Sequence, residues 1–284
     1  MGKRLQMRAA AVVVVAACIL DAAVAGAQCP EQWAILRGSQ VVGPTAQPLP
    51  PQTIATTWFM RQTGGGGPYG TWRLVRQVTE FSFQTPLPMV PPSGPTTLPI
   101  GDQVHPCLMS YTATSAGIDC ESGIDYQVTQ QGIFAPGGIH AGQVQNGQLQ
   151  IETVPADVGL ATAPGQPTPG AMTMVGRPGA LANQVRIDLA ANRNSAQAPS
   201  AFRVFFTVRI DPAALLDHVT LTYDFPGAAL TQYGVSADGL SRTAVYSLPG
   251  TSRLTDAMLD HAVKAELVLD TCRYTVTARL RDIL

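Results

Sequence analysis

The densest group of carboxylates in the first half of the chain lies in residues 117–125, which read Gly-Ile-Asp-Cys-Glu-Ser-Gly-Ile-Asp. Asp119, Glu121 and Asp125 follow one another closely on this glycine-bearing segment, and carboxylate oxygens are ligands that Ca²⁺ prefers. The spacing differs from the twelve-residue calcium loop, and a polar turn beside Cys120 explains the same residues. We therefore expect no cofactor, with calcium as the alternative and these three carboxylates as its candidate ligands.

A second candidate site consists of aromatic residues around a glycine run. Trp58, Tyr69 and Trp72 surround residues 63–70, which include four consecutive glycines. Aromatic faces beside a segment with large backbone freedom can stack on sugar rings or anchor a protein partner. This predicts a binding surface for a glycan or a protein. The alternative is that Trp58 and Trp72 fill the core of a sheet, which leaves Tyr69 as the exposed residue.

Residue types used in catalysis are present, but their spacing does not define a catalytic site. Ser236 lies in Gly-Val-Ser-Ala-Asp-Gly, whose second glycine falls one place too late for a nucleophile elbow. A hydrolytic site could combine His261 with Asp256 or Asp260. No two histidines are spaced four residues apart, as a metalloprotease helix would require; they lie at positions 105, 140, 218 and 261.

Paired carboxylates form the basis of an alternative enzymatic function. Glu80 or Asp102, together with the group around Asp119, could provide a general acid and a general base for polysaccharide hydrolysis. The sequence does not fix the separation of these carboxylates. We therefore predict a non-catalytic binding, adhesion or structural protein, with a secreted hydrolase on a jelly-roll-like sandwich as the alternative.

The N-terminus has the three parts of a secretory signal peptide. A basic start is followed by an apolar run over residues 9–20 and by small-x-small patterns ending at Ala25 and Ala27. The apolar run is shorter than the about 20 residues of a membrane-spanning helix. It continues beyond Cys18, which disfavours lipid attachment there. We expect cleavage of residues 1–27 and a secreted, periplasmic or cell-surface protein without a transmembrane segment.

The charge of the expected mature chain disfavours polyanionic partners. Removal of residues 1–27 takes away three basic residues and one acidic residue from the 18 basic and 19 acidic residues of the full chain. The slightly acidic remainder gives no electrostatic reason to bind nucleic acid. The sequence carries no signal for the oligomeric state.

Four cysteines remain in the mature chain, and an even number in an exported protein predicts disulfides. Two bonds allow three pairings. We predict Cys107 with Cys120 because this bond closes a short loop. Cys29 is then left with Cys272, which would tie the start of the mature chain to its last strand.

The composition changes near residue 180. Residues 28–180 contain 19 prolines and 21 glycines, whereas residues 181–284 contain four of each. Runs rich in these residues commonly link packed units, so we place a domain boundary in residues 163–179. This divides the chain into a Pro/Gly-rich β region with long loops, residues 28–180, and a sandwich-like region, residues 181–284. One β domain over residues 28–284 is the alternative.

Alternation of apolar and polar residues predicts the strands. The clearest example is residues 202–210, in which every second side chain is apolar, from Phe202 to Ile210. Asn146-Gly147 and Asp238-Gly239 are two-residue hairpin turns by their residue types. Together these patterns predict an all-β fold, an antiparallel β-sandwich with long loops. At most one short helix is expected, within residues 251–264.

Two further strands are expected in the first half. Residues 57–62 and 71–83 alternate on either side of the glycine run, which predicts two strands joined by a mobile loop. The alternation slips between Leu74 and Val78, as a β-bulge would cause.

Overall fold

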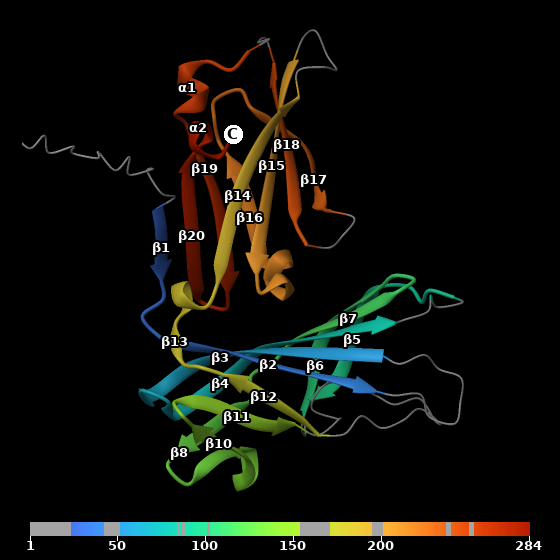
Figure 1. The fold of residues 1–284 in the computed structure, drawn as a ribbon, viewed down its shortest axis with the longest axis vertical. Helices are drawn as coiled ribbons and strands as arrows, with labels where there is room; N and C mark the ends of the chain where they lie inside the picture. The colour runs from blue at the N-terminus through green and yellow to red at the C-terminus, as the bar shows by residue number, and fades with distance from the viewer. Residues whose placement is uncertain are drawn as a thin grey trace, which may run out of the picture.

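The computed structural model confirms an all-β, antiparallel fold, built from three sheets (Figure 1). It describes residues 24–42, 52–83, 86, 89–100, 103–153, 171–194, 201–236, 240–249 and 253–284. Two sheets of four strands form a sandwich at one end of the molecule, and a sheet of twelve strands forms the other end.

The sandwich contains the strands from the second half of the chain and one strand from the beginning. Its first sheet has the order β14–β15–β18–β17, and its second has the order β1–β20–β19–β16. Without β1, these are the strand orders of an immunoglobulin constant-type sandwich. The strands are β1 (Val24–Gln28), β14 (Arg186–Asn194), β15 (Ala201–Asp211), β16 (Val219–Tyr223), β17 (Ala229–Val235), β18 (Arg242–Pro249), β19 (Ala262–Leu269) and β20 (Cys272–Arg279).

The core of the sandwich follows the predicted alternation. The five alternate residues of β15 from Phe202 to Ile210 are all buried. Phe206 lies at the centre, with its ring centroid 5.2 Å from that of Tyr223 and 5.7 Å from that of Tyr246. The strand therefore buries one face against the opposite sheet, as its period of two requires.

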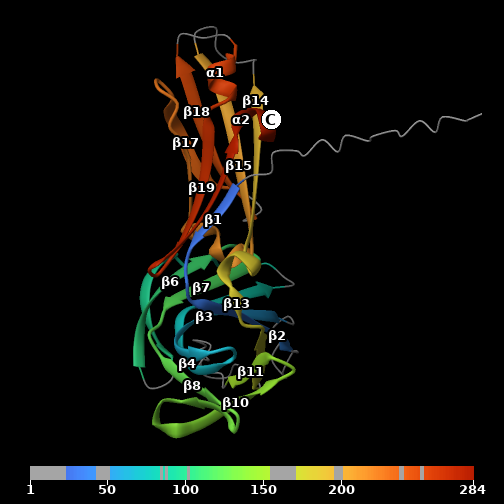
Figure 2. The ribbon, with the colours of Figure 1, turned by 90° about the vertical axis from the view of Figure 1, so that its left-hand side faces the viewer.

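The twelve-stranded sheet closes into a barrel, where the sequence predicted a sandwich (Figure 2). The ring runs β2–β3–β4–β8–β9–β10–β11–β12 and returns to β2 through the pair Val175 and Arg37. The strands of the ring are β2 (Gln32–Val42), β3 (Gln52–Gly66), β4 (Tyr69–Phe83), β8 (Asp125–Thr129), β9 (Gly132–Ala135), β10 (Ile139–Gln145), β11 (Gln148–Thr153) and β12 (Met172–Gly176).

The length of β4 and two glycines explain the closure. The first part of β4 pairs with β8, and its second part pairs with β7 (Ser115–Glu121), which continues into β6 (Gln103–Tyr111) and β5 (Gly94–Ile100). A Cβ on Gly142 or Gly176 would collide with the carbonyl group of a neighbouring strand. Glycine therefore permits the tight coiling of the ring at these two positions.

Several predicted registers are confirmed. Asn146 and Gly147 both have positive φ, 52° and 73°, and Val144 lies opposite Leu149. Tyr233 lies opposite Ala244, as expected for a turn at Asp238-Gly239, although residues 237–239 lie outside the described part of the chain.

The predicted bulge lies at Val75. Phe59 pairs with Arg76, whereas the next residue, Met60, pairs with Leu74, so Val75 is an extra residue in β4.

A short helix lies within residues 251–264, as predicted, but it covers only four of them. Only α1 (Asp256–Leu259) is helical, with Thr255 as its N-cap, and residues 262–264 begin β19. Val263 and Ala265 are fully buried in the sandwich, and burial of this alternating face outweighs the weak helical preference. A second short helix, α2 (Leu280–Ile283), follows the last strand.

Both predicted disulfides are confirmed. Cys107 is bonded to Cys120 and Cys29 to Cys272. The second bond joins the connection between β1 of the sandwich and β2 of the barrel sheet to the first residue of β20.

A continuous core also crosses this junction. Trp33, Ile35, Phe59 and Val78 on the outer face of the barrel sheet belong to the same cluster as the sandwich core. The strands of residues 32–180 form the barrel sheet and those of residues 181–284 belong to the sandwich, and the two parts share one hydrophobic core cluster. The division into two domains stays a prediction.

Candidate functional site

The three aromatic residues of the predicted binding surface lie in different environments. Trp58 and Trp72 are buried in the barrel, with 1% and 0% of their surface exposed, whereas Tyr69 is 39% exposed at the tip of the β3–β4 hairpin. The indole of Trp58 packs against Tyr126, at 5.8 Å between ring centroids. A ligand at the surface could therefore contact Tyr69 but not the two tryptophans.

The glycine run is not a mobile loop, contrary to our expectation. β3 continues to Gly66 and β4 begins at Tyr69, so the turn is only Gly67-Pro68. The buried Gln62 side chain donates hydrogen bonds to the carbonyls of Gly67 (3.1 Å) and Tyr69 (2.8 Å). The Trp72 indole N–H donates to the Pro68 carbonyl (3.0 Å). These side-chain hydrogen bonds hold the hairpin tip in place without a binding partner. The glycine pattern of the sequence does not reveal them.

The three candidate calcium ligands also differ in their surroundings. Asp125 accepts two hydrogen bonds from Arg73, at 2.8 and 2.9 Å, and Asp119 accepts two from Arg76, at 2.6 and 2.7 Å. Glu121 is exposed. Among the residues that the structure describes, no group of three or more His, Cys, Asp or Glu side chains could hold a metal ion. The calcium site stays a prediction, and two of its three carboxylates already have cationic partners.

Asp119 is the centre of a contact that the sequence did not reveal. Nε2 of His218 lies 3.6 Å from Oδ2 of Asp119. His218 ends the 3-10 helix η4 (Ala213–His218) of the sandwich, whereas Asp119 lies on β7 of the barrel sheet. Burial raises the pKa of Asp119, but the nearby imidazole of His218 and the two hydrogen bonds from Arg76 outweigh it, so the pKa lies below its usual value.

The predicted hydrolytic group around His261 is not assembled. His261 pairs with Asp224, at 2.8 Å between Nε2 and Oδ1. Asp260 instead forms an ion pair with Arg281 at 2.6 Å. Ser236 hydrogen bonds to Ser241, as expected for a residue of the hairpin connection.

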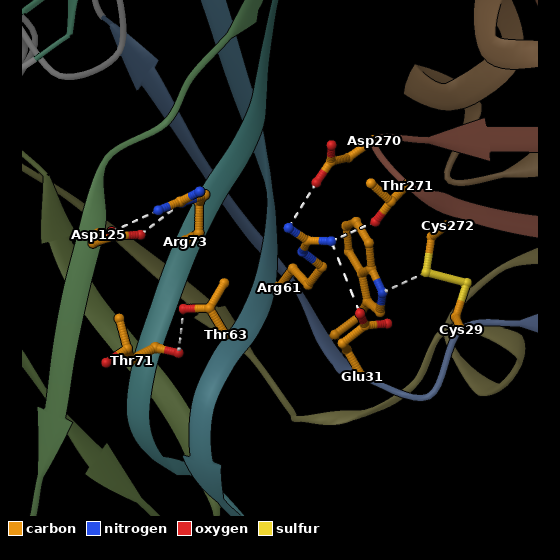
Figure 3. A network of polar contacts seen from close by, with 11 residues as sticks. Cys29, Glu31, Arg61, Thr63, Thr71, Arg73, Asp125, Asp270, Thr271 and Cys272 are labelled. Carbon is orange, nitrogen blue, oxygen red and sulfur yellow. Dashed lines mark hydrogen bonds and ion pairs between the residues drawn. A yellow bond between two sulfur atoms is a disulfide. The ribbon is translucent and has the colours of Figure 1, made fainter.

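A polar network joins the barrel sheet to the sandwich near the Cys29–Cys272 disulfide (Figure 3). Arg61 of β3 contacts Asp270 at 2.9 Å and donates to the Thr271 hydroxyl at 2.6 Å, both in the β19–β20 turn. The indole N–H of Trp33 donates to the sulfur of Cys272 at 3.2 Å. This network is structural, because its members are committed to one another.

A groove of about 530 Å³ lies elsewhere along the same junction. One wall is the outer face of β2, β3, β4 and β12, and the other is the end of β15 with the start of η4. Its lining is Arg37, Gly38, Ser39, Ala55, Thr56, Thr57, Glu80, Thr173, Asp211, Pro212, Ala213 and Ala214. An ion pair between Arg37 and Asp211, 3.1 Å long, connects the two walls.

Several polar groups of the groove are available to a ligand. The hydroxyls of Ser39, Thr57 and Thr173 and the carboxylate of Glu80 have no side-chain hydrogen-bond or ion-pair partner in the described part of the chain. Hydroxyls both donate and accept hydrogen bonds, and a carboxylate accepts them. The groove therefore suits a polar ligand with several donors and acceptors. Glu80 was considered from the sequence, but its neighbours in the groove were not.

Comparisons with known proteins do not assign a function. No family model, no curated protein and no solved structure matches the chain.

Proposed function

We propose that the protein is an exported, non-catalytic binding protein that holds a hydroxyl-rich ligand, such as a surface glycan, in the groove at the junction. The observation that supports this is one groove in which three hydroxyls and the Glu80 carboxylate have no side-chain partner among the described residues. In ligand-binding sites, a small number of polar groups at defined positions, such as these hydroxyls and this carboxylate, determine specificity.

Export is part of this proposal. The two disulfides fit an oxidising compartment. No helix in the described residues is long and apolar enough to cross a membrane.

Polysaccharide hydrolysis is the second candidate function. Glu80 and Asp211 both line the groove, and glycosidases use two carboxyl groups on either side of the scissile bond. Asp119 is not among the residues that line the groove, and Asp102 lies outside the described residues. The carboxylate pair to test is therefore Glu80 with Asp211.

The test is a glycan-array binding assay with the purified mature protein and an Ala55→Trp variant. Ala55 lines the groove on β3, so an indole there fills the space of the ligand. Val41→Trp is the matched control, because Val41 is an exposed residue of β2 outside the groove lining. We expect binding by the wild type and the control and loss of binding in Ala55→Trp.

Two results would contradict the proposal. Equal binding by both tryptophan variants would place the ligand elsewhere. Release of reducing ends from a bound polysaccharide, abolished by Glu80→Gln, would show that the protein is a hydrolase.

A further inference from the structure

The floor of the groove is a narrow slot between two polar rims. Ser39 on β2 lies directly opposite Ala55 on β3, and Ala55 lies directly opposite Glu80 on β4. Neighbouring strands are about 4.8 Å apart, so Ser39 and Glu80 stand about 10 Å apart with only a methyl group between them. Such a slot suits one six-membered ring lying over Ala55.

The charges of the slot are not balanced. Arg37 is paired with Asp211 across the groove, whereas Glu80 has no cationic partner among the described residues. The three charged residues of the lining leave one net negative charge, located at Glu80. Since an ionised carboxylate only accepts hydrogen bonds, the ligand group beside Glu80 must be a donor. A protonated amine is a donor that also gains from the charge.

The remaining lining favours a saccharide over a basic peptide. Ser39, Thr57 and Thr173 offer hydroxyls that match a ligand with several hydroxyl groups of its own. The apolar lining is limited to Ala55, Pro212 and two alanines, which is too little apolar surface to cover the stem of a lysine or arginine.

We propose that the ligand is an amino sugar, with its protonated amine next to Glu80 and its ring over Ala55. This inference rests on the proposed binding function and specifies the ligand for the same groove. At about 4 Å in water-like surroundings, the attraction between amine and carboxylate gives about fivefold tighter binding than a neutral group.

The experiment is isothermal titration of the mature protein with two tetrasaccharides, one of glucosamine and one of N-acetylglucosamine. At about pH 6 and low salt the amine is protonated, and we expect the glucosamine form to bind about fivefold more tightly. High salt should reduce the difference through screening. Glu80→Gln should abolish the difference, whereas Asp188→Asn, which removes an exposed carboxylate outside the groove, should preserve it.

The outcomes separate this inference from the proposed function. Equal affinity for both tetrasaccharides, or a preference that survives Glu80→Gln, overturns the role of the amine but leaves glycan binding intact. If neither tetrasaccharide binds and the glycan array also shows no binding, the proposed function is overturned. Binding of tetralysine as tight as that of the glucosamine tetrasaccharide overturns the assignment to a saccharide.

Discussion

Replacement of Gln77 by methionine should stabilise the protein. Gln77 lies on the inner face of β4, directly opposite Trp58 and Cys120, and is only 1% exposed. Within the described part of the chain, neither its carboxamide oxygen nor its nitrogen has a hydrogen-bond partner. A buried polar group without a partner costs about 1–3 kcal/mol. Methionine has a similar length and adapts its shape, so it removes this cost without leaving a large cavity.

The expected gain is about 1–3 kcal/mol in the free energy of unfolding. For a chain of this size, each kcal/mol corresponds to about 2–4 °C in Tm. Urea unfolding followed by tryptophan fluorescence gives the free energy, and a thermal scan gives the Tm.

Gln62→Met is the matched control. Gln62 is also a buried glutamine of the β3–β4 hairpin, but its amide donates two hydrogen bonds to the hairpin tip. Its replacement should destabilise by about 1–2 kcal/mol. If Gln77→Met is destabilised as much as Gln62→Met, then Gln77 is satisfied in solution, and our account of the barrel interior is wrong.

Three further predictions concern the core, the junction and export. Phe206→Ala should lower the free energy of unfolding by about 3–5 kcal/mol, because the ring is fully buried; a change near zero in urea unfolding would contradict this. The pKa of Asp119 is depressed, so its stabilisation is present above about pH 4 and is lost as the pH falls through the folded-state pKa. The stability difference between wild type and Asp119→Asn should therefore shrink below about pH 4, and a constant difference in acid titrations would refute this. N-terminal sequencing of exported protein should show cleavage after Ala25 or Ala27, whereas an intact Met1 would contradict the signal peptide.

Local patterns predicted the strands wherever one face is buried and the other is polar. In β15 every second side chain from Phe202 to Ile210 enters the core, so the sequence period equals the structural period. The Asn146-Gly147 turn was predictable for a similar reason, because its positive φ angles are a local demand on residue type. Such features depend on neighbours within a few positions.

Closure of the barrel depends on residues that are far apart in the sequence, so local patterns did not predict it. β12 lies within the Pro/Gly-rich run that we interpreted as a linker, and its partner β2 is far away in the sequence. Gly176 permits the close approach of β12 to β2, but its residue type equally suits a loop. A glycine in the sequence is consistent with a close backbone contact, but the sequence does not show which strand makes that contact.

The candidate groove is a consequence of tertiary structure alone. Arg37 and Glu80 lie on strands with ordinary patterns, and Asp211 joins them only because β15 ends above the barrel sheet. The wall that contains Asp211 is anchored at both ends of its segment. One anchor is the pair with Arg37, and the other is the contact of His218 with Asp119. The width of the groove is therefore set by the same contacts that join the sandwich to the barrel, which explains why neither half of the sequence alone predicts a binding site.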